Sequence, residues 1–271
     1  MTLSYHHAIS VLQLIIYLPS IFLAAFLVYR HGLRTNSGFI FLTTFSLTRV
    51  VGACCDLASI SNPSTGLFTA AAICSAVGLS PLMLACVGLL SRANLSIQHT
   101  TSRPALPSTA FSLFRILTVV AMAISIAGIT ANMSAEGLAH PDIKTKVGMI
   151  LYLVSWAAMV LILLVVTSRR SSLERGEHRT LLAVAISSPF ILVRVIYATL
   201  IWFLHNGTFS ILNGNETVIL VMSVLEEFVV VIVCLGVGMT LRVRSTQGSR
   251  SKGEEAAMPD YPSKPLDVTD S

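Results

Sequence analysis

The chain has 271 residues, of which 54% are hydrophobic and 11% are charged, and its formal net charge is +5. Soluble domains carry about 25% charged residues. This chain has too few of them to cover a water-exposed surface, so a soluble globular protein is excluded. The mean hydropathy of +0.78 agrees with that conclusion. We therefore expect an integral membrane protein whose main partner is the lipid bilayer.

Seven apolar runs are each long enough to cross the roughly 30 Å hydrocarbon core of a bilayer. In chain order they cover residues 8–29, 38–60, 67–91, 111–132, 145–167, 180–204 and 217–241. The runs are continuous and do not alternate in units of about ten residues, which excludes a β-barrel. The fold class we expect is all-α, a polytopic bundle of seven transmembrane helices that forms one domain over residues 1–241.

The segments between and after the runs are polar. No Lys or Arg precedes the run 8–29, and this run is longer than the apolar part of a signal peptide, so we interpret it as a retained helix. The connection 92–110 contains Ser, Thr and two prolines, and we expect it to lack fixed structure. Residues 242–271 change abruptly to a polar composition, which is typical of a disordered tail.

The Lys and Arg residues predict the orientation. Fourteen of them lie in the connections after the first, third and fifth runs or in the C-terminal tail, against Lys144 and Lys146 on the other side. Because basic connections stay in the cytosol, the N-terminus is expected outside or in a lumen and the tail in the cytosol. The membrane is an endomembrane or the plasma membrane. These basic residues form no stripe with aromatic residues, so no nucleic-acid partner is expected.

Three Asn-x-Ser/Thr sequons fall on or beside the predicted outer connections, and they are candidate glycosylation sites. They begin at Asn132, Asn206 and Asn215. Asn132 and Asn215 lie close to the bilayer, where the glycosylation machinery reaches poorly. Asn206 is therefore the best candidate, although none of the three need carry a sugar.

Five ionisable residues lie inside the apolar runs: Arg49, Asp56, Arg194, Glu226 and Glu227. Such residues are costly in a membrane and are functional candidates by default. Arg49, Arg194 and the two glutamates fall at similar depth, near the middle of the membrane. Asp56 follows Arg49 by seven residues, which places it on the same helix face about 10 Å nearer the outer surface. We expect these groups to neutralise one another in one polar layer.

The two adjacent glutamates point about 100° apart on a helix, so only one of them can face an arginine squarely. The other is expected to face a cavity or to bond to the backbone. The last two runs are joined by a short connection and should pack as an antiparallel pair. Arg194 is therefore expected to neighbour Glu226 or Glu227.

Several roles remain open for this layer. In a structural role, Arg–Glu pairs fix helix packing. In an enzyme, Glu226 or Glu227 is the catalytic acid or proton carrier that acts on a small apolar substrate, and the arginines tune it. In a receptor, the layer binds a ligand while the Arg-rich fifth connection and the tail meet a cytosolic partner. In a transporter, the carboxylates couple protons to movement. The segments 47–51 and 192–196 (LTRVV and LVRVI) show a faint similarity. Internal repeats are known in some transporters, although so short an apolar pattern also arises by chance.

The sequence predicts neither a cofactor nor a metal. No histidine lies deep in an apolar run, which argues against a membrane di-metal oxygenase and a bis-histidine haem protein. The five cysteines all lie in apolar runs and form no C-x-x-C motif, so no cysteine metal site is indicated.

Several motifs over residues 4–241 resemble those of a family of seven-helix membrane proteins of filamentous fungi without an assigned activity. They are Leu14-Ile-Ile-Tyr-Leu-Pro19, Phe45-Ser-Leu-Thr-Arg-Val-Val-Gly52, Gly78-Leu-Ser-Pro-Leu82, Leu89-Leu-Ser-Arg92, Pro189-Phe-Ile-Leu-Val-Arg-Val-Ile-Tyr197, Asn213-Gly-Asn-Glu-Thr-Val218 and Val221-Met-Ser-Val-Leu-Glu-Glu227. The resemblance implies a seven-helix fold and carries over no reaction. Some relatives look like products of secondary-metabolite gene clusters, which implies an endomembrane location and a small apolar metabolite as ligand.

Overall fold

The computed structural model describes residues 5–31, 37–62, 64–101, 104–131, 142–173, 176–203 and 220–241, all within the unit that ends at Leu241. The predicted sequons at Asn132, Asn206 and Asn215 lie outside the described residues, and so does the tail 242–271.

The described residues form helices and no strand, and seven helical stretches among them are long and apolar enough to cross a membrane. The helices are α1 (Tyr5–His31), α2 (Ser37–Ala58), α3 (Thr65–Val77), α4 (Leu79–Thr101), α5 (Ser108–Ala131), α7 (Ile143–Ser168), η1 (Arg170–Ser172), α8 (His178–Phe203), η3 (Leu220–Leu225) and α10 (Glu226–Thr240). The predicted all-α class with seven spanning helices is confirmed. A helix satisfies its own backbone hydrogen bonds, which a bilayer cannot do for it.

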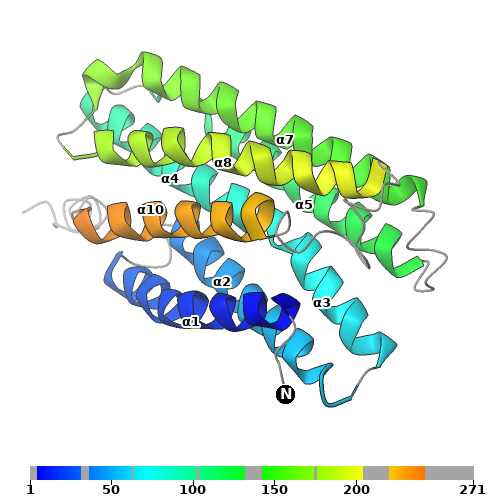
Figure 1. The fold of residues 1–271 in the computed structure, drawn as a ribbon. Coiled ribbons are helices and arrows are strands. Elements are labelled where there is room, and N and C mark those ends of the chain that lie inside the picture. The colour runs from blue at the N-terminus through cyan, green and yellow to red at the C-terminus, as the bar shows by residue number, and fades with distance from the viewer. Residues whose placement is uncertain are drawn as a thin grey trace, which may run out of the picture. The chain divides into compact units, whose positions relative to one another are not determined.

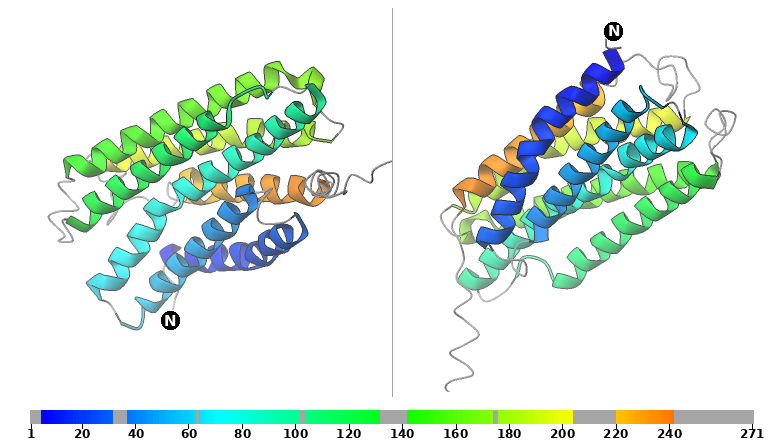
Figure 2. Two further views of the ribbon diagram at one scale, coloured as in Figure 1. Left: turned by 180° about the vertical axis from the view of Figure 1, so that it is seen from behind. Right: turned by 90° about the horizontal axis from the view of Figure 1, so that it is seen from below.

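Neighbouring spans pack mostly in chain order, with two exceptions that matter for the site. The helix pairs α1–α2, α5–α7 and α7–α8 are in contact along the bundle. The last helix, α10, lies between α8 and α1, while α4 packs against α2, α5, α7 and α8 (Figures 1 and 2). As a result, α10 contacts both the first helix, α1, and a helix of the second half of the chain, α8.

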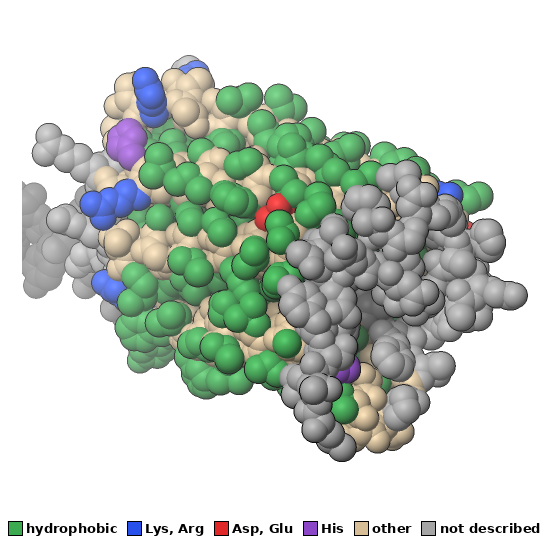
Figure 3. Space-filling model, viewed as in Figure 1, with side chains coloured by type: hydrophobic (Ala, Val, Ile, Leu, Met, Phe, Trp, Pro, Cys, Tyr) green, Lys and Arg blue, Asp and Glu red, His purple; other side chains and the backbone are tan. Residues whose placement is uncertain are grey.

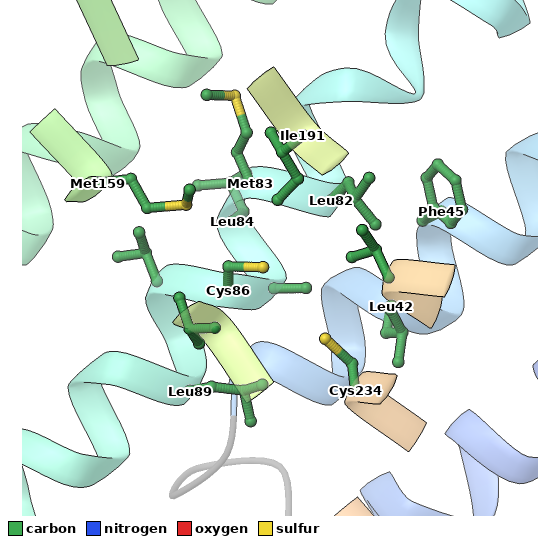
Figure 4. Packing of buried hydrophobic residues seen from close by; sticks show 14 of the residues in the cluster. Leu42, Phe45, Leu82, Met83, Leu84, Cys86, Leu89, Met159, Ile191 and Cys234 are labelled. Carbon is green, nitrogen blue, oxygen red and sulfur yellow. The ribbon is translucent and has the colours of Figure 1, made fainter. Parts of the chain in front are cut away.

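The core is centred on α4, the most buried of the candidate spans. Its side chains Leu82, Met83 and Cys86 are almost completely buried. Residues of α2, α7, α8 and α10 surround them, as Figure 4 shows for Leu42, Phe45, Met159, Ile191 and Cys234. In contrast, the large hydrophobic side chains on the outside of the bundle are exposed, for example Ile15 (65%) and Phe22 (69%) of α1. This arrangement suits a helix whose outer face meets lipid.

Small residues allow the closest helix contact, between α5 and α7. A Cβ atom on Gly128 would overlap the backbone of Thr145, and a Cβ atom on Gly148 would meet the backbone of Ser125. Hydrophobic burial does not drive helices together within lipid, so close packing of small residues is one of the forces that does.

The third span differs from the prediction. We expected a helix over 67–91 followed by an unstructured connection 92–110, but the helix is interrupted at Gly78 and α4 then continues to Thr101. Two buried polar side chains explain the extension. Arg92 forms an ion pair with Glu177 at 2.9 Å, and the amide of Asn94 exchanges two hydrogen bonds with the backbone of Leu106.

Candidate functional site

The carboxylate of Glu227 collects three donors from three other helices. Its Oε1 atom accepts a hydrogen bond from Arg49 Nη2 on α2 and another, of 2.8 Å, from Arg194 Nε on α8. Its Oε2 atom accepts from the hydroxyl of Tyr17 on α1 at 3.3 Å. All four side chains are buried, with Glu227 only 1% exposed. We call these four residues the Glu227 cluster.

The Glu227 cluster confirms the expected contact between Arg194 and a carboxylate of the last helix. Arg49 joins it as well, so the two arginines that were predicted at similar depth meet at one oxygen atom. Tyr17 was missed by the sequence reasoning. Its position two residues before Pro19 in an apolar run gave no signal that a buried hydroxyl was needed there.

The third span is interrupted beside the arginines of the Glu227 cluster. Gly78 lies against the guanidinium of Arg49, where a Cβ atom would come within 2.8 Å of Nη2. The last carbonyls of a helix lack partners in their own helix, and here Ser75 O of α3 accepts a hydrogen bond of 3.2 Å from Arg194 Nη2. The break therefore supplies both the space and an acceptor for the two arginines.

Pro81 removes a backbone hydrogen bond next to this break. Pro81 has no N–H to donate to Val77 O four residues earlier, and the hydroxyl of Ser80 donates to that carbonyl instead, at 3.2 Å. A serine beside the proline thus satisfies the carbonyl that the proline leaves without a donor.

A second irregularity, the π-helix η3, lies immediately before the two glutamates. In a π-helix each N–H bonds five residues back instead of four, so one extra residue turns the following side chains by about 100°. Glu227 faces the arginines, whereas Glu226 is half-buried beside it. As predicted from their spacing, only one of the glutamates faces the arginines.

Aromatic rings surround the charges. The guanidinium of Arg49 lies 5.5 Å from the centre of the Phe45 ring, and that of Arg194 lies 6.0 Å from the Tyr197 ring. Tyr17 meets the Phe45 ring edge-on. The negative faces of aromatic rings attract cations where water is absent, so these rings contribute favourable contacts to both guanidinium groups.

Glu226 contrasts with its neighbour. Its Oε2 atom is buried and has no hydrogen-bond partner among the described residues. The charged groups that act on it electrostatically are Arg194 and Glu227. Figure 3 shows an acidic patch within hydrophobic surface at the place where η3 meets α10 in Figure 1. Glu226 is thus the one of the two carboxyl groups with unused capacity for a proton or a ligand.

The expected place of Asp56 in the polar layer is wrong. Asp56 Oδ2 accepts a hydrogen bond of 2.6 Å from the hydroxyl of Ser10 and lies 3.1 Å from His7 Nδ1. Because α1 and α2 are antiparallel and in contact, the end of α2 lies beside the beginning of α1. Asp56 therefore bonds to side chains of α1. Nothing in the sequence indicated that His7 would contact Asp56.

A further buried ion pair, Arg92 with Glu177, lies near the start of α8 and was also missed. Besides bonding to Arg92, the carboxylate of Glu177 accepts a hydrogen bond of 3.1 Å from the hydroxyl of Thr180. In the described part of the chain, no group of three His, Cys, Asp or Glu residues could hold a metal ion.

Together these features define a multi-pass α-helical membrane protein with an ion cluster at the middle of its spans. The chain belongs to the family described as a domain of unknown function, DUF7702, whose model matches residues 3–244. No match to the chain is found among curated proteins or among solved structures.

The geometry predicts opposite stabilities for the two glutamine variants. Glu227→Gln leaves two buried arginines without a counter-charge, and the free energy of unfolding should fall by about 3–5 kcal/mol, as when one partner of a buried ion pair is removed. Glu226→Gln should cost far less, because none of the described arginines bonds to its carboxylate. Thermal unfolding of the purified full chain in detergent measures both. Equal losses, or a larger loss for Glu226→Gln, would contradict this assignment.

Proposed function

We propose that this protein is a proton-coupled carrier of a small apolar molecule. In this proposal Glu226 binds the proton, and the Glu227 cluster holds its four helices together while the bundle changes conformation. One observation carries the proposal: two adjacent carboxyl groups have different surroundings. Glu227 accepts hydrogen bonds from both arginines, whereas Oε2 of Glu226 has no hydrogen-bond partner among the described residues. The hydrogen bonds that hold the Glu227 cluster together do not involve Glu226.

The helix interruptions favour transport over a purely structural role. Transporters bind their substrates near the middle of the membrane, where discontinuous helices expose backbone groups. Here the break at Gly78 and the π-helix η3 both border the Glu227 cluster. The similar segments 47–51 and 192–196 supply Arg49 and Arg194, which bind the same oxygen atom. Such an arrangement is expected of an internal repeat.

The charges of the layer explain how a proton could be coupled to movement. The layer holds two guanidinium groups and two carboxyl groups, so it is neutral when Glu226 and Glu227 are both ionised. A proton on Glu226 leaves one positive charge in a medium where charge is costly. Protonation therefore changes the relative stability of any two helix arrangements that expose the layer differently.

The proposal includes an orientation. Among the described residues, Arg30, Arg115, Arg169, Arg170 and Arg179 lie at the ends of helices that meet at one end of the bundle, and Lys144 and Lys146 lie at the other. Figure 3 shows most of the visible basic side chains at one end. The positive-inside rule then supports a cytosolic C-terminus and an outer or lumenal N-terminus. The resemblance to fungal proteins supports an endomembrane or the plasma membrane.

Reporter fusions test this orientation. A reporter that is active only in the cytosol should give signal after Arg170 and after Ser271, and none when inserted near Ala139, because the basic ends stay inside. A glycosylation reporter at Ala139 should show the reverse. Signal from the cytosolic reporter at Ala139 would overturn the orientation.

A second function is favoured by the same unused carboxyl group. An intramembrane enzyme could use protonated Glu226 as a general acid on an apolar substrate such as a polyene. Glu227 is unsuited to that role, because both of its oxygens already accept hydrogen bonds. Carrier and enzyme differ in what happens to the small molecule: a carrier moves it unchanged, whereas an enzyme converts it.

Metabolite profiles of cells and medium separate these functions. Cells that lack the protein should show an unchanged set of compounds with one of them redistributed between cells and medium. An accumulated precursor would favour the enzyme, and unchanged profiles with altered responses to a stimulus would favour a receptor with a cytosolic partner. Either of these outcomes would contradict the carrier.

Glu226→Gln should reproduce the loss of the protein in that assay while its abundance and membrane location stay normal, because the variant keeps shape but binds no proton. Glu226→Asp retains the carboxyl group and is the matched control, expected to keep at least part of the activity. If Glu226→Gln behaves like the wild type, proton coupling at this residue is wrong.

A further inference from the structure

Glu226 lies on the border between the inside of the bundle and its lipid-facing surface. On η3 and α10 it belongs to a half-buried stripe with Met222, Val229 and Val233, next to the exposed side chains Leu225 (43%) and Ile232 (60%). In Figure 3, an acidic patch lies beside hydrophobic side chains. A molecule dissolved in the bilayer can therefore approach this carboxyl group without crossing a water-filled entrance.

We propose that Glu226 is a binding site for lipophilic organic cations, which reach it from the bilayer at the border of α8 and α10. This inference rests on the proposed carrier function and changes its cargo from a wholly apolar molecule to one that is apolar except for a single positive charge. The site combines a single anionic acceptor with apolar surroundings, so it fits a molecule that has a hydrophobic body and one positive charge.

The contacts of the Glu227 cluster explain why the ligand should be cationic. Arg194 donates its Nε–H to Glu227 and its Nη2–H to Ser75 O, and neither of these bonds is made to Glu226. The charged groups near Glu226, which are Arg194 and Glu227, oppose each other in sign. Oε2 of Glu226 is buried and has no hydrogen-bond partner among the described residues, while the side chain as a whole is half-buried at the lipid-facing border. A cation at this border would meet a carboxylate to which no described arginine bonds, whereas an anion would be repelled by its charge.

Competition between the cation and the proton follows from the shared site. The carboxyl group of Glu226 either carries a proton or pairs with the cation, and each occupant adds one positive charge to the layer. Because the carboxyl group of Glu226 can hold the proton or the cation but not both, the release of one allows the other to bind. The carrier would therefore exchange protons for the cation. No other protein group is needed to couple them.

An apolar carbodiimide tests access from the bilayer. With the full chain in phosphatidylcholine vesicles, protonated Glu226 should add to dicyclohexylcarbodiimide. The carboxyl oxygen bonds to the central carbon, the proton moves to nitrogen, and the acyl group then shifts to nitrogen, so the whole reagent stays attached. Peptide mass spectrometry should find the adduct on Glu226 and not on Glu227. Glu226→Asp should retain labelling, and Glu226→Gln should lose it.

Two probes of similar shape and opposite charge test the ligand class. Tetraphenylphosphonium at about ten times its dissociation constant should lower the labelling of Glu226 by about tenfold, by mass action, whereas tetraphenylborate should leave labelling unchanged. Equal protection by both ions would show an apolar site without charge selection and would overturn the proposal. Protection by neither ion would overturn it as well.

The outcomes separate this inference from the proposed function. Labelling of Glu226 by a water-soluble carbodiimide, with none by the apolar reagent, would place the carboxyl group in water and refute entry from the bilayer, while proton coupling could still hold. Conversely, selective protection by tetraphenylphosphonium combined with normal activity of Glu226→Gln would establish the binding site and refute the carrier function.

Discussion

The arrangement of the bundle depends on one requirement: a charge inside a membrane must be neutralised where it lies. Glu227 binds two arginines at once, because one of its oxygens accepts from Arg49 and from Arg194, and an ionised Glu226 beside it balances the second positive charge. The bond from Tyr17 adds α1 to α2, α8 and α10. Charged groups buried without partners would cost several kcal/mol each, so these four helices can separate only if the cluster breaks or gains another partner.

Regular helices alone could not build this cluster. The side chains of Arg49 and Arg194 need room and an additional acceptor, which the break at Gly78 and the carbonyl of Ser75 provide. The extra residue of the π-helix η3 sets the direction in which Glu226 and Glu227 point. Irregular backbone inside a membrane is tolerated where protein groups satisfy it, and here the same groups that satisfy it carry the charges.

The sequence predicted the spans and the depth of the charges because both depend on spacing along single helices. It did not predict which glutamate binds the arginines, since η3 changes the facing of the helix and leaves no clear sequence signal. Asp56 was misplaced for a related reason: its partners, Ser10 and His7, lie on another helix. The extension of α4 beyond residue 91 likewise depends on a distant partner, Glu177.

The most direct test of this account measures the coupling free energy between Glu227 and each arginine by double-mutant cycles in detergent. The variants Glu227→Gln, Arg49→Met and Arg194→Met are unfolded singly and in pairs. Residues that share one network couple by about 0.5–3 kcal/mol, and we predict coupling in that range for both pairs, so each double variant loses less than the sum of its single variants. Additive losses for both pairs would contradict a shared carboxylate at the centre of the bundle.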